Sequence, residues 1–342
     1  MQVPDYELPL AAIAQVPAEP RDSARLLVAL GGRLGRADGQ GRERPPPQHL
    51  TVADLPDLLG RGDVLIVNTS RVMPARLHLR KETGGRAEVL LLEPAAGGTW
   101  EALVRPGRRL APGAVLYRDG QPVLEVGERL SEGRRVVKPL LGEAELTGAG
   151  ELALPPYIHQ PLADPSRYQT VYAERPGSVA APTAGLHLTG RVLDRCRGRG
   201  VKVVGLDLAV GLGTFRPMKA QRAEDHVMHA EHYRVPDATW ESVRYAKGRV
   251  VAVGTTTLRA LESAATTGLL QGKTELYVRP GHVFSTADIL MTNFHQPRST
   301  LLLMLEAFCG PGWRELYREA LAEGYRFLSF GDAMLVQRHV PG

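Results

Sequence analysis

Polar clusters that contain glycine or small residues recur along the second half of the chain, and their side chains could bind a ligand or transfer a proton. Each cluster follows or interrupts a short apolar run that is typical of a buried strand. The clusters are GLGTFR at 211–216, GTTTLR at 254–259, TNFHQPRST at 292–300 and FGDA at 330–333. Ligands of open α/β sheets bind beyond the carboxyl ends of the strands, so we expect the four clusters to converge on one pocket.

Two of these clusters have features of a ligand-binding loop. GTTT precedes an expected helix, and the N–H groups of a helix N-terminus together with hydroxyls could hold an anion such as a carboxylate. Alternatively, Thr255 or Thr256 only caps the helix. GLGTF lacks the full dinucleotide-binding pattern and its acidic partner, so its glycines more simply let the backbone approach a ligand. Phe215 could stack on a base or belong to the core.

Three titratable residues are candidates for proton transfer. His187 lies in the Gly/Ala-rich segment PTAGLHL, and His295 lies where a strand is expected to end. Either imidazole could accept a proton, or could be a buried structural residue. Asp332 is an unusual residue for a strand, which favours a role as a base or as a contact to a hydroxyl or amine.

Histidine and arginine spacing raises two further hypotheses. His226, His229 and His232 follow the spacing i, i+3, i+6, which could serve a metal. Three steps of 100° would spread these rings over much of a helix, and the segment lacks the H-E-x-x-H pattern, so we expect no metal. Basic residues could contact a phosphate backbone or form a solvated surface, in the groups Arg105/Arg108/Arg109, Arg134/Arg135/Lys138 and Arg191/Arg195/Arg197/Arg199.

Length and composition bound the kind of protein. The 342 residues are enough for about two domains, and 42 Lys and Arg against 37 Asp and Glu give a net charge of +5. Two cysteines exclude a disulfide framework. No apolar run approaches about 18 residues, and MQVPDYELPL does not resemble a signal peptide. We therefore expect a cytoplasmic protein that does not bind a membrane.

The elements that must position these residues follow from the hydrophobic pattern. Between 73 and 153, short alternating segments separated by Gly or Pro turns predict a small antiparallel sheet or barrel. After 157, strands alternate with helices, which predicts a mainly parallel sheet. The expected strands are 201–210, 249–253, 274–278, 287–291 and 325–330, and the expected helices are 189–197, 238–247, 299–308, 313–323 and one from 257.

The first part of the chain completes this organisation. Thr51 is expected to cap a short helix that ends near Leu59, after an exposed loop at 31–48. The apolar run at 62–68 is expected to join the later sheet. The fold class is therefore α/β, with a mainly parallel sheet domain formed by residues 1–71 and 155–342 and an inserted small antiparallel β-barrel domain at 72–154.

Longer segments carry a resemblance to a known family. The block GSVAAPTAGLHLT at 177–189 is highly specific, and other matching blocks follow one another nearly from end to end. They are DYELP at 5–9, RLLV at 25–28, RVMPARL at 71–77, LPPYI at 154–158, RYQTVYA at 167–173, VGLGTFRP at 210–217, VAVGTTTLRALES at 251–263, TNFHQPRSTLL at 292–302 and YRFLSFGDAML at 325–335. The chain closely resembles the S-adenosylmethionine:tRNA ribosyltransferase-isomerases of queuosine biosynthesis.

The resemblance implies a reaction and its partners. The enzyme would take tRNA with a queuosine-type anticodon, carrying 7-aminomethyl-7-deazaguanine at the wobble position. It would transfer and isomerise the ribosyl part of S-adenosylmethionine onto the aminomethyl group, giving epoxyqueuosine-tRNA, adenine and methionine. S-adenosylmethionine would be a consumed substrate, with no cofactor or metal, and the protein would be a monomer with an α/β domain and a β-barrel domain.

The sequence departs from the family pattern at two positions. The family usually has Asn-Asp-Thr-Arg after the first strand, whereas this chain has Asn68-Thr69-Ser70-Arg71. The family often has histidine at the position of Ala209. If either group transfers a proton in the relatives, another residue must do so here, and the candidates are His187, His295, Glu231 and Asp332.

The expected site combines these residues. His187 or His295 would remove a C5′ proton, which the sulfonium acidifies, and Asp332 would hold the amine or the ribose. The Gly254–Thr257 turn would bind the methionine carboxylate, and Phe215 would contact adenine or deazaguanine. The expected substrate-binding residues are Thr183, Gly211, Gly213, Thr214, Phe215, Arg216, Glu231, Gly254, Thr255, Thr256, Thr257, Arg259, Asn293 and Phe294.

Two other classes of protein remain as alternatives from the sequence. One is an RNA-binding protein without catalysis, whose pocket holds a metabolite. The other is a metal hydrolase that uses the histidines at 226–232.

Overall fold

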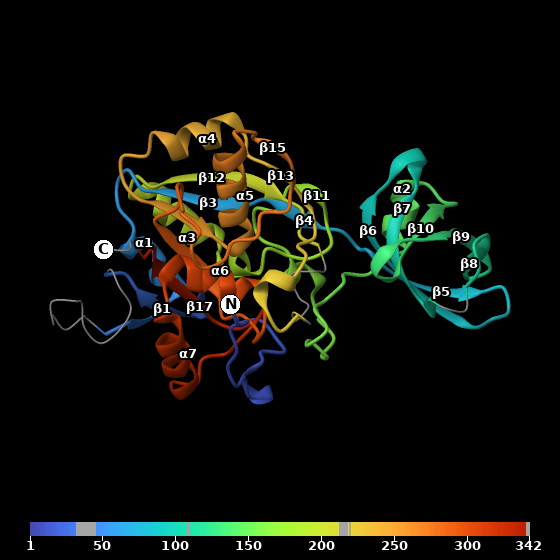
Figure 1. Ribbon diagram of the computed structural model, residues 1–342, viewed down its shortest axis with the longest axis horizontal. Helices are drawn as coiled ribbons and strands as arrows, with labels where there is room; N and C mark the ends of the chain where they lie inside the picture. Colours follow the sequence, from blue (N-terminus) through green and yellow to red (C-terminus); the bar gives the residue numbers. More distant parts are fainter. Residues whose placement is uncertain (32–45, 108–109, 212–217, 219, 340–342) are drawn as a thin grey trace. The chain divides into compact units, whose positions relative to one another are not determined.

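A computed structural model describes residues 1–31, 46–107, 110–211, 218 and 220–339 (Figure 1). The chain forms two compact units. The larger unit comprises Met1–Ser70, Pro155–Arg175 and Ala181–Gly342, and the smaller comprises Arg71–Leu154 and Pro176–Ala180. The loop expected at 31–48 lies almost entirely outside the described residues.

A nine-stranded sheet forms the centre of the larger unit, in the order β15-β13-β12-β3-β14-β16-β17-β1-β2. Its strands are β1 (Arg25–Ala29), β2 (Gln48–Thr51), β3 (Val64–Asn68), β12 (Lys202–Leu208), β13 (Glu231–Arg234), β14 (Val250–Val253), β15 (Gln271–Thr274), β16 (Ile289–Asn293) and β17 (Ala333–Gln337). The run at 62–68 therefore supplies β3, at the middle of the sheet, as the sequence predicts.

The centre of this sheet is parallel, and most of its outer pairs are antiparallel, although β1 pairs parallel with β17. β12, β3, β14 and β16 run parallel to one another, and every residue of β3, β14 and β16 is buried. Such continuous apolar strands need cover on both faces. β16 pairs antiparallel with β17, and β13, β15 and β2 also join antiparallel. The expected α/β class is confirmed, and the antiparallel outer pairs are an addition to it.

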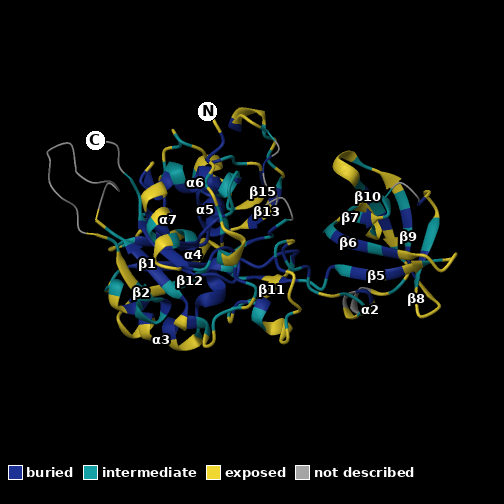
Figure 2. Cartoon of the chain, turned by 90° about the horizontal axis from the view of Figure 1, so that it is seen from below, coloured by how far each residue is buried: buried dark blue, intermediate teal, exposed yellow. Residues whose placement is uncertain are grey.

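Helices cover both faces of this sheet (Figures 1 and 2). α1 and α3 pack on the face formed by residues such as Leu65, Val251 and Ile289. Because side chains alternate along a strand, the intervening residues face the other side, where α5 contacts β3, β14 and β16. The helices are α1 (Leu55–Leu58), α3 (Gly190–Gly198), α4 (Asp237–Arg244), α5 (Thr255–Thr267), α6 (Thr300–Cys309) and α7 (Trp313–Ala322).

Capping residues fix where several of these helices begin. The hydroxyl of Thr189 accepts a hydrogen bond from the Val192 N–H at the start of α3, and Ser299 caps α6 in the same way. Thr51 forms a capping box with Asp54 before the short turn that leads into α1. These starts are readable in the sequence because a capping bond needs only neighbours in the chain. None of the described helices combines the length and the apolar character that a membrane span requires.

The smaller unit contains a closed antiparallel barrel in the order β10-β7-β6-β5-β8-β9. Its strands are β5 (Arg76–Lys81), β6 (Arg86–Pro94), β7 (Trp100–Arg105), β8 (Ala114–Arg118), β9 (Gln121–Arg129) and β10 (Arg134–Pro139), and the helix α2 (Glu143–Gly148) follows them. The strands arise from the short alternating segments between 73 and 153, so the expected barrel is confirmed. Closure removes the unpaired edges that a small open sheet would expose.

Two expected strands are wrong. No strand occupies 325–330, because Leu328 has a φ of 69° in a turn, and the last strand, β17, begins at Ala333. The apolar run at 325–330 reflects burial of its aromatic rings in the core, not strand pairing. β15 ends at Thr274, where 274–278 was expected to form a strand. The histidines at 226–232 lie on a loop and the start of β13, not on a helix.

The arginine groups mostly serve the fold. Each arginine of the group at 191–199 pairs with an aspartate, which favours the solvated-surface interpretation over phosphate contact. Arg134 pairs with Glu101 at 2.7 Å. Arg135 is buried inside the barrel, where it donates to the carbonyl oxygens of Leu110 and Gly127, each at 2.7 Å. Arg108 and Arg109 lie outside the described residues.

We predict that Arg135→Ala destabilises the protein by about 2–4 kcal/mol, because it leaves buried carbonyl oxygens without donors and opens a cavity. The matched control is Arg134→Ala, which removes a partly exposed ion pair and should cost about 1 kcal/mol or less. Urea unfolding followed by circular dichroism measures both. Equal losses for the two variants would contradict a structural role for Arg135 in the barrel.

Candidate functional site

Two adjoining pockets of about 550 and 540 Å³ lie in the larger unit, and both are lined by Thr255, Thr256 and Leu301. The Glu231 pocket is further lined by His226, Met228, His229, Glu231, Arg259, Leu276, Tyr277, Val278, Thr300 and Met304. The Asn293 pocket is further lined by Tyr157, Ala181, Pro182, Thr183, Ala184, Val210, Gly254, Thr292, Asn293, Phe294, His295, Gln296, Leu328 and Ser329.

The topology of the sheet places both pockets. The lining residues Val210, Gly254 and Asn293 lie at or just beyond the carboxyl ends of β12, β14 and β16. Within this sheet, β12 and β14 both come after β3 in the chain and lie on opposite sides of it. The carboxyl end of β3 is therefore a topological switch point, where ligands of α/β sheets bind. Segments far apart in the sequence therefore meet at one edge of the sheet.

The N-terminus of α5 separates the two pockets. Gly254, with a φ of 92°, precedes the helix and offers no side chain to cap it, so neither Thr255 nor Thr256 is the capping residue. The first N–H groups of a helix have no partner within it. Thr255 is 6% exposed, and its hydroxyl has no hydrogen-bond partner among the described residues. This helix start is a ready site for an anion.

Two amide side chains tie this edge of the sheet together. Asn68, at the end of β3, donates to the Leu208 carbonyl at 3.0 Å and to the Thr256 hydroxyl at 3.3 Å. Its oxygen accepts the N–H groups of Ser70 and Leu208. The neighbouring Thr69 donates to the Leu206 carbonyl and does not line either pocket. Asn68 thus anchors the ends of β3 and β12 to the first turn of α5.

Asn293, at the end of β16, connects this strand to the segment that contains Thr183 and His187. Its oxygen accepts the Thr183 hydroxyl at 2.9 Å, and its nitrogen donates to Nε2 of His187 at 2.9 Å. His187 is thereby held as the neutral tautomer that carries its proton on Nδ1. Burial, with Arg326 and Arg21 nearby, lowers its pKa to about 4. His187 lies behind Asn293 and does not line either pocket.

His295 is the histidine that lines the Asn293 pocket. Its Nε2 lies 3.1 Å from the Thr292 hydroxyl, and its backbone is fixed by the hydroxyls of Tyr317 and Tyr6. Burial alone lowers its pKa to about 3. Its neighbour Phe294 also lines the pocket, but its side chain is fully buried in an aromatic cluster with Tyr317 and others.

Asp332 serves the backbone. One carboxylate oxygen accepts the Arg25 N–H at 2.9 Å, and the other accepts the Arg326 N–H at 2.7 Å. The residue is buried and does not line either pocket. Its unusual position at the start of a strand is explained by these bonds, which hold the turn before β17 against β1.

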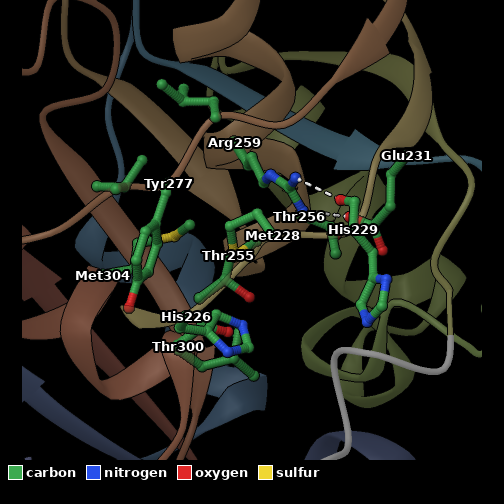
Figure 3. A pocket seen from close by; sticks show the side chains of 13 residues that line it. His226, Met228, His229, Glu231, Thr255, Thr256, Arg259, Tyr277, Thr300 and Met304 are labelled. Atoms are coloured by element: carbon green, nitrogen blue, oxygen red, sulfur yellow. Dashed lines mark hydrogen bonds and ion pairs between the residues drawn. The ribbon is translucent and has the colours of Figure 1, made fainter. Parts of the chain in front are cut away.

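The Glu231 pocket is built around a buried ion pair, drawn in Figure 3. The guanidinium of Arg259 donates to Glu231 at 2.5 Å and also to the carbonyl oxygens of Thr274 and His229. The other Glu231 oxygen accepts the Gly211 N–H at 2.9 Å. Burial lowers the pKa of Arg259, and the charge of Glu231 opposes that effect. The pair therefore fixes β13, α5 and the end of β15 around one carboxylate.

The remaining expected residues are placed as follows. Thr257 is fully buried and donates to the carbonyl of Val253 at the end of β14. Gly213, Thr214, Phe215 and Arg216 lie outside the described residues. Ala209 pairs its N–H with the His232 carbonyl and does not line either pocket. Among the described residues, no group of three or more metal-ligating side chains could hold a metal.

Several lining residues gave no signal in the sequence. Tyr157 and Ser329, hydrogen-bonded at 2.7 Å, come from segments without a recognisable motif. Met228, Tyr277 and Met304 resemble ordinary core residues in a sequence. Their role depends on which segments the fold brings together, and only local patterns can be read from the chain.

The fold and the site define an α/β protein with an additional β-barrel unit and two adjoining pockets in the larger unit. The chain belongs to the family described as "Queuosine biosynthesis protein", which matches residues 2–336. This confirms the resemblance drawn from the sequence.

Similar proteins share nearly the whole length of the chain. Relatives named S-adenosylmethionine:tRNA ribosyltransferase-isomerase are 48% identical in Rubrobacter xylanophilus and 47% in Moorella thermoacetica, covering 97% of this chain and 96% and 98% of theirs. The crystal structure of S-adenosylmethionine tRNA ribosyltransferase from Thermotoga maritima is 34% identical, with a TM-score of 0.53 and coverage of 97% of this chain and 99% of that one.

The lowered pKa of His187 predicts a pH dependence of stability. An unfolded imidazole titrates near 6.5, so between pH 6.5 and about 4 the unfolded chain binds more protons than the folded one. Stability should therefore fall as the pH is lowered through this range. His187→Gln should reduce the loss by on the order of 2–3 kcal/mol.

The measurement is the free energy of unfolding in urea at pH 6.5 and pH 4.5. His159→Gln, which changes an exposed histidine of the same unit, is the matched control and should keep the wild-type loss. If His187→Gln loses as much unfolding free energy between pH 6.5 and pH 4.5 as the wild type does, the buried imidazole is not the source of that loss.

Proposed function

We propose that the protein transfers and isomerises the ribosyl moiety of S-adenosylmethionine onto 7-aminomethyl-7-deazaguanine in tRNA, releasing adenine and methionine. The observation that carries this proposal is the pair of pockets that share Thr255 and Thr256 in a chain of this family. S-adenosylmethionine in one pocket and the tRNA base in the other would meet at the first turn of α5. Holding two reactants in this way supplies much of the rate enhancement of a group transfer.

S-adenosylmethionine fits the Asn293 pocket. Its carboxylate would bind the N–H groups and the Thr255 hydroxyl at the start of α5. The polar groups of this pocket are neutral amides, hydroxyls and an imidazole, which suit a nucleoside with a positively charged sulfonium. A fixed cation at this position would repel the sulfonium, and the lining residues within the described part of the chain carry none.

His295 is our choice for the residue that accepts the C5′ proton, because it lines this pocket and His187 does not. The lowered pKa keeps the His295 imidazole neutral at neutral pH, so that it has a lone pair that can accept a proton. Elimination then expels adenine, which takes up a proton, and the substrate amine attacks the sugar; methionine leaves as a ribose hydroxyl oxygen closes the epoxide. His187 would act as a positioning residue through Asn293, and Asp332 would position the turn before β17.

The partners follow from this reaction. The acceptor would be tRNA with a queuosine-type anticodon, and we propose that the protein acts in the cytoplasm as a monomer. S-adenosylmethionine would be consumed, with no other cofactor.

The direct test is incubation with labelled S-adenosylmethionine and precursor tRNA. Release of adenine and methionine that depends on this tRNA supports the proposal, and a chelator should leave the rate unchanged. Binding of both molecules without release would support a non-catalytic RNA-binding protein. Loss of activity with the chelator would support a metal-dependent enzyme.

We predict that Thr255→Val raises KM for S-adenosylmethionine by roughly 10-fold with little change in kcat, because one hydrogen bond to a charged group is lost. Thr266→Val, an exposed position in the same helix, is the matched control and should leave both constants unchanged. Steady-state kinetics at saturating RNA measures the effect. An unchanged KM for Thr255→Val would remove the α5 N-terminus as the carboxylate site.

A further inference from the structure

We propose that the Glu231 pocket receives the acceptor base and that the Glu231 carboxylate selects it by its donor edge. This inference rests on the proposed function and assigns the second pocket of that site. The chemistry to be recognised is a 7-deazaguanine, whose N1–H and exocyclic amine are adjacent hydrogen-bond donors.

The charge of the lining residues distinguishes the two pockets. Among the described residues that line them, Glu231 is the only carboxylate. A carboxylate accepts hydrogen bonds through about four lone pairs and donates none. It therefore complements the two-donor edge of a guanine-type base. The corresponding edge of adenine has an acceptor nitrogen, which a carboxylate repels. This pocket therefore disfavours the adenosine of S-adenosylmethionine.

The carboxylate is held rigidly, as a selecting group must be. Arg259 and the Gly211 N–H fix its two oxygens from different elements, and the residue is 7% exposed. A buried polar group discriminates strongly because a ligand that fails to match it leaves it unpaired. Arg259 is in turn fixed by two backbone carbonyl oxygens, so the acceptor group cannot swing away.

The other walls of the pocket suit a planar ring. Figure 3 shows Tyr277 and Met304 at one side of the pocket and Glu231 at the other. Met228 adds a second thioether to the lining. Aromatic rings and polarisable sulfur pack well against the face of a heterocycle. A base that entered here would have its faces against apolar groups and its edge toward the carboxylate.

Two exposed residues next to the Glu231 pocket, Arg279 and Val227, could contact an RNA. Arg279 is exposed, and its guanidinium lies 5.8 Å from the centre of the Tyr277 ring. No carboxylate pairs with it within the described part of the chain, so it can meet a phosphate. Val227, between the lining residues His226 and Met228, is 77% exposed and offers an apolar contact to an unstacked base.

The test uses two anticodon stem-loop RNAs. One carries 7-aminomethyl-7-deazaguanine, and the other carries 7-aminomethyl-7-deazahypoxanthine, which lacks the exocyclic amine. The full-length wild-type protein should show a kcat/KM roughly 10- to 100-fold higher on the first. Glu231→Gln replaces one of the two acceptor oxygens by a donor NH2 group and removes the charge, so this preference should largely disappear while KM for S-adenosylmethionine changes less than about 2-fold.

The matched control is Glu275→Gln, an exposed carboxylate two residues from Tyr277, which should keep the wild-type preference. An unchanged preference in Glu231→Gln, or a large rise in its KM for S-adenosylmethionine, would overturn the assignment. A wild-type protein that releases no adenine with the first RNA would instead refute the proposed function, whatever Glu231 does.

Glu231→Gln leaves Arg259 buried without its counter-ion, which can destabilise the fold. The double variant Glu231→Gln/Arg259→Gln removes both charges and keeps a hydrogen-bonding pair. Thermal unfolding shows which variant is folded at the assay temperature, and the preference is then measured on that variant. Retained preference in a folded variant that lacks the Glu231 carboxylate contradicts the proposal.

Discussion

The uncapped N-terminus of α5 is the feature on which both pockets depend. Parallel strands must be connected by crossovers, so β14 leads directly into α5 at the carboxyl edge of the sheet. Gly254 makes this turn with a positive φ and supplies no capping side chain. The first N–H groups of the helix consequently face the space between the pockets, where a ligand can satisfy them. An ordinary capping residue would stabilise the helix and close that site.

Amide side chains hold the surrounding backbone in place without adding charge. Asn68 connects β3, β12 and α5, and Asn293 connects β16 with Thr183 and His187. An amide both donates and accepts, so one residue can satisfy several buried groups. The same burial keeps His187 and His295 neutral. The described residues that line the Asn293 pocket are therefore uncharged, whereas those of the Glu231 pocket include an ion pair, and this difference underlies the assignment of two ligands.

Much of the architecture could be predicted from the sequence because it rests on local patterns. Alternation in the six segments between 76 and 139 defines the barrel strands, since one face of each is buried. The continuous apolar runs of β3 and β14 define central strands, and Thr189 defines the start of α3 by a bond to a near neighbour. The segment at 325–330 was misread because its aromatic rings are buried by tertiary packing in a turn, which strand periodicity cannot distinguish.

The sequence by itself determined the two kinds of unit, the family and two of the segments that line the pockets, at 254–256 and 292–296, because these depend on neighbours in the chain and on long matching blocks. Only the tertiary structure decided what each polar side chain does. His295 lines a pocket and His187 supports Asn293 from behind, while the Asp332 carboxylate is bound by backbone N–H groups. These roles depend on partners that lie far away in the sequence, and a hydrogen bond over a few ångströms has no signature in residue order.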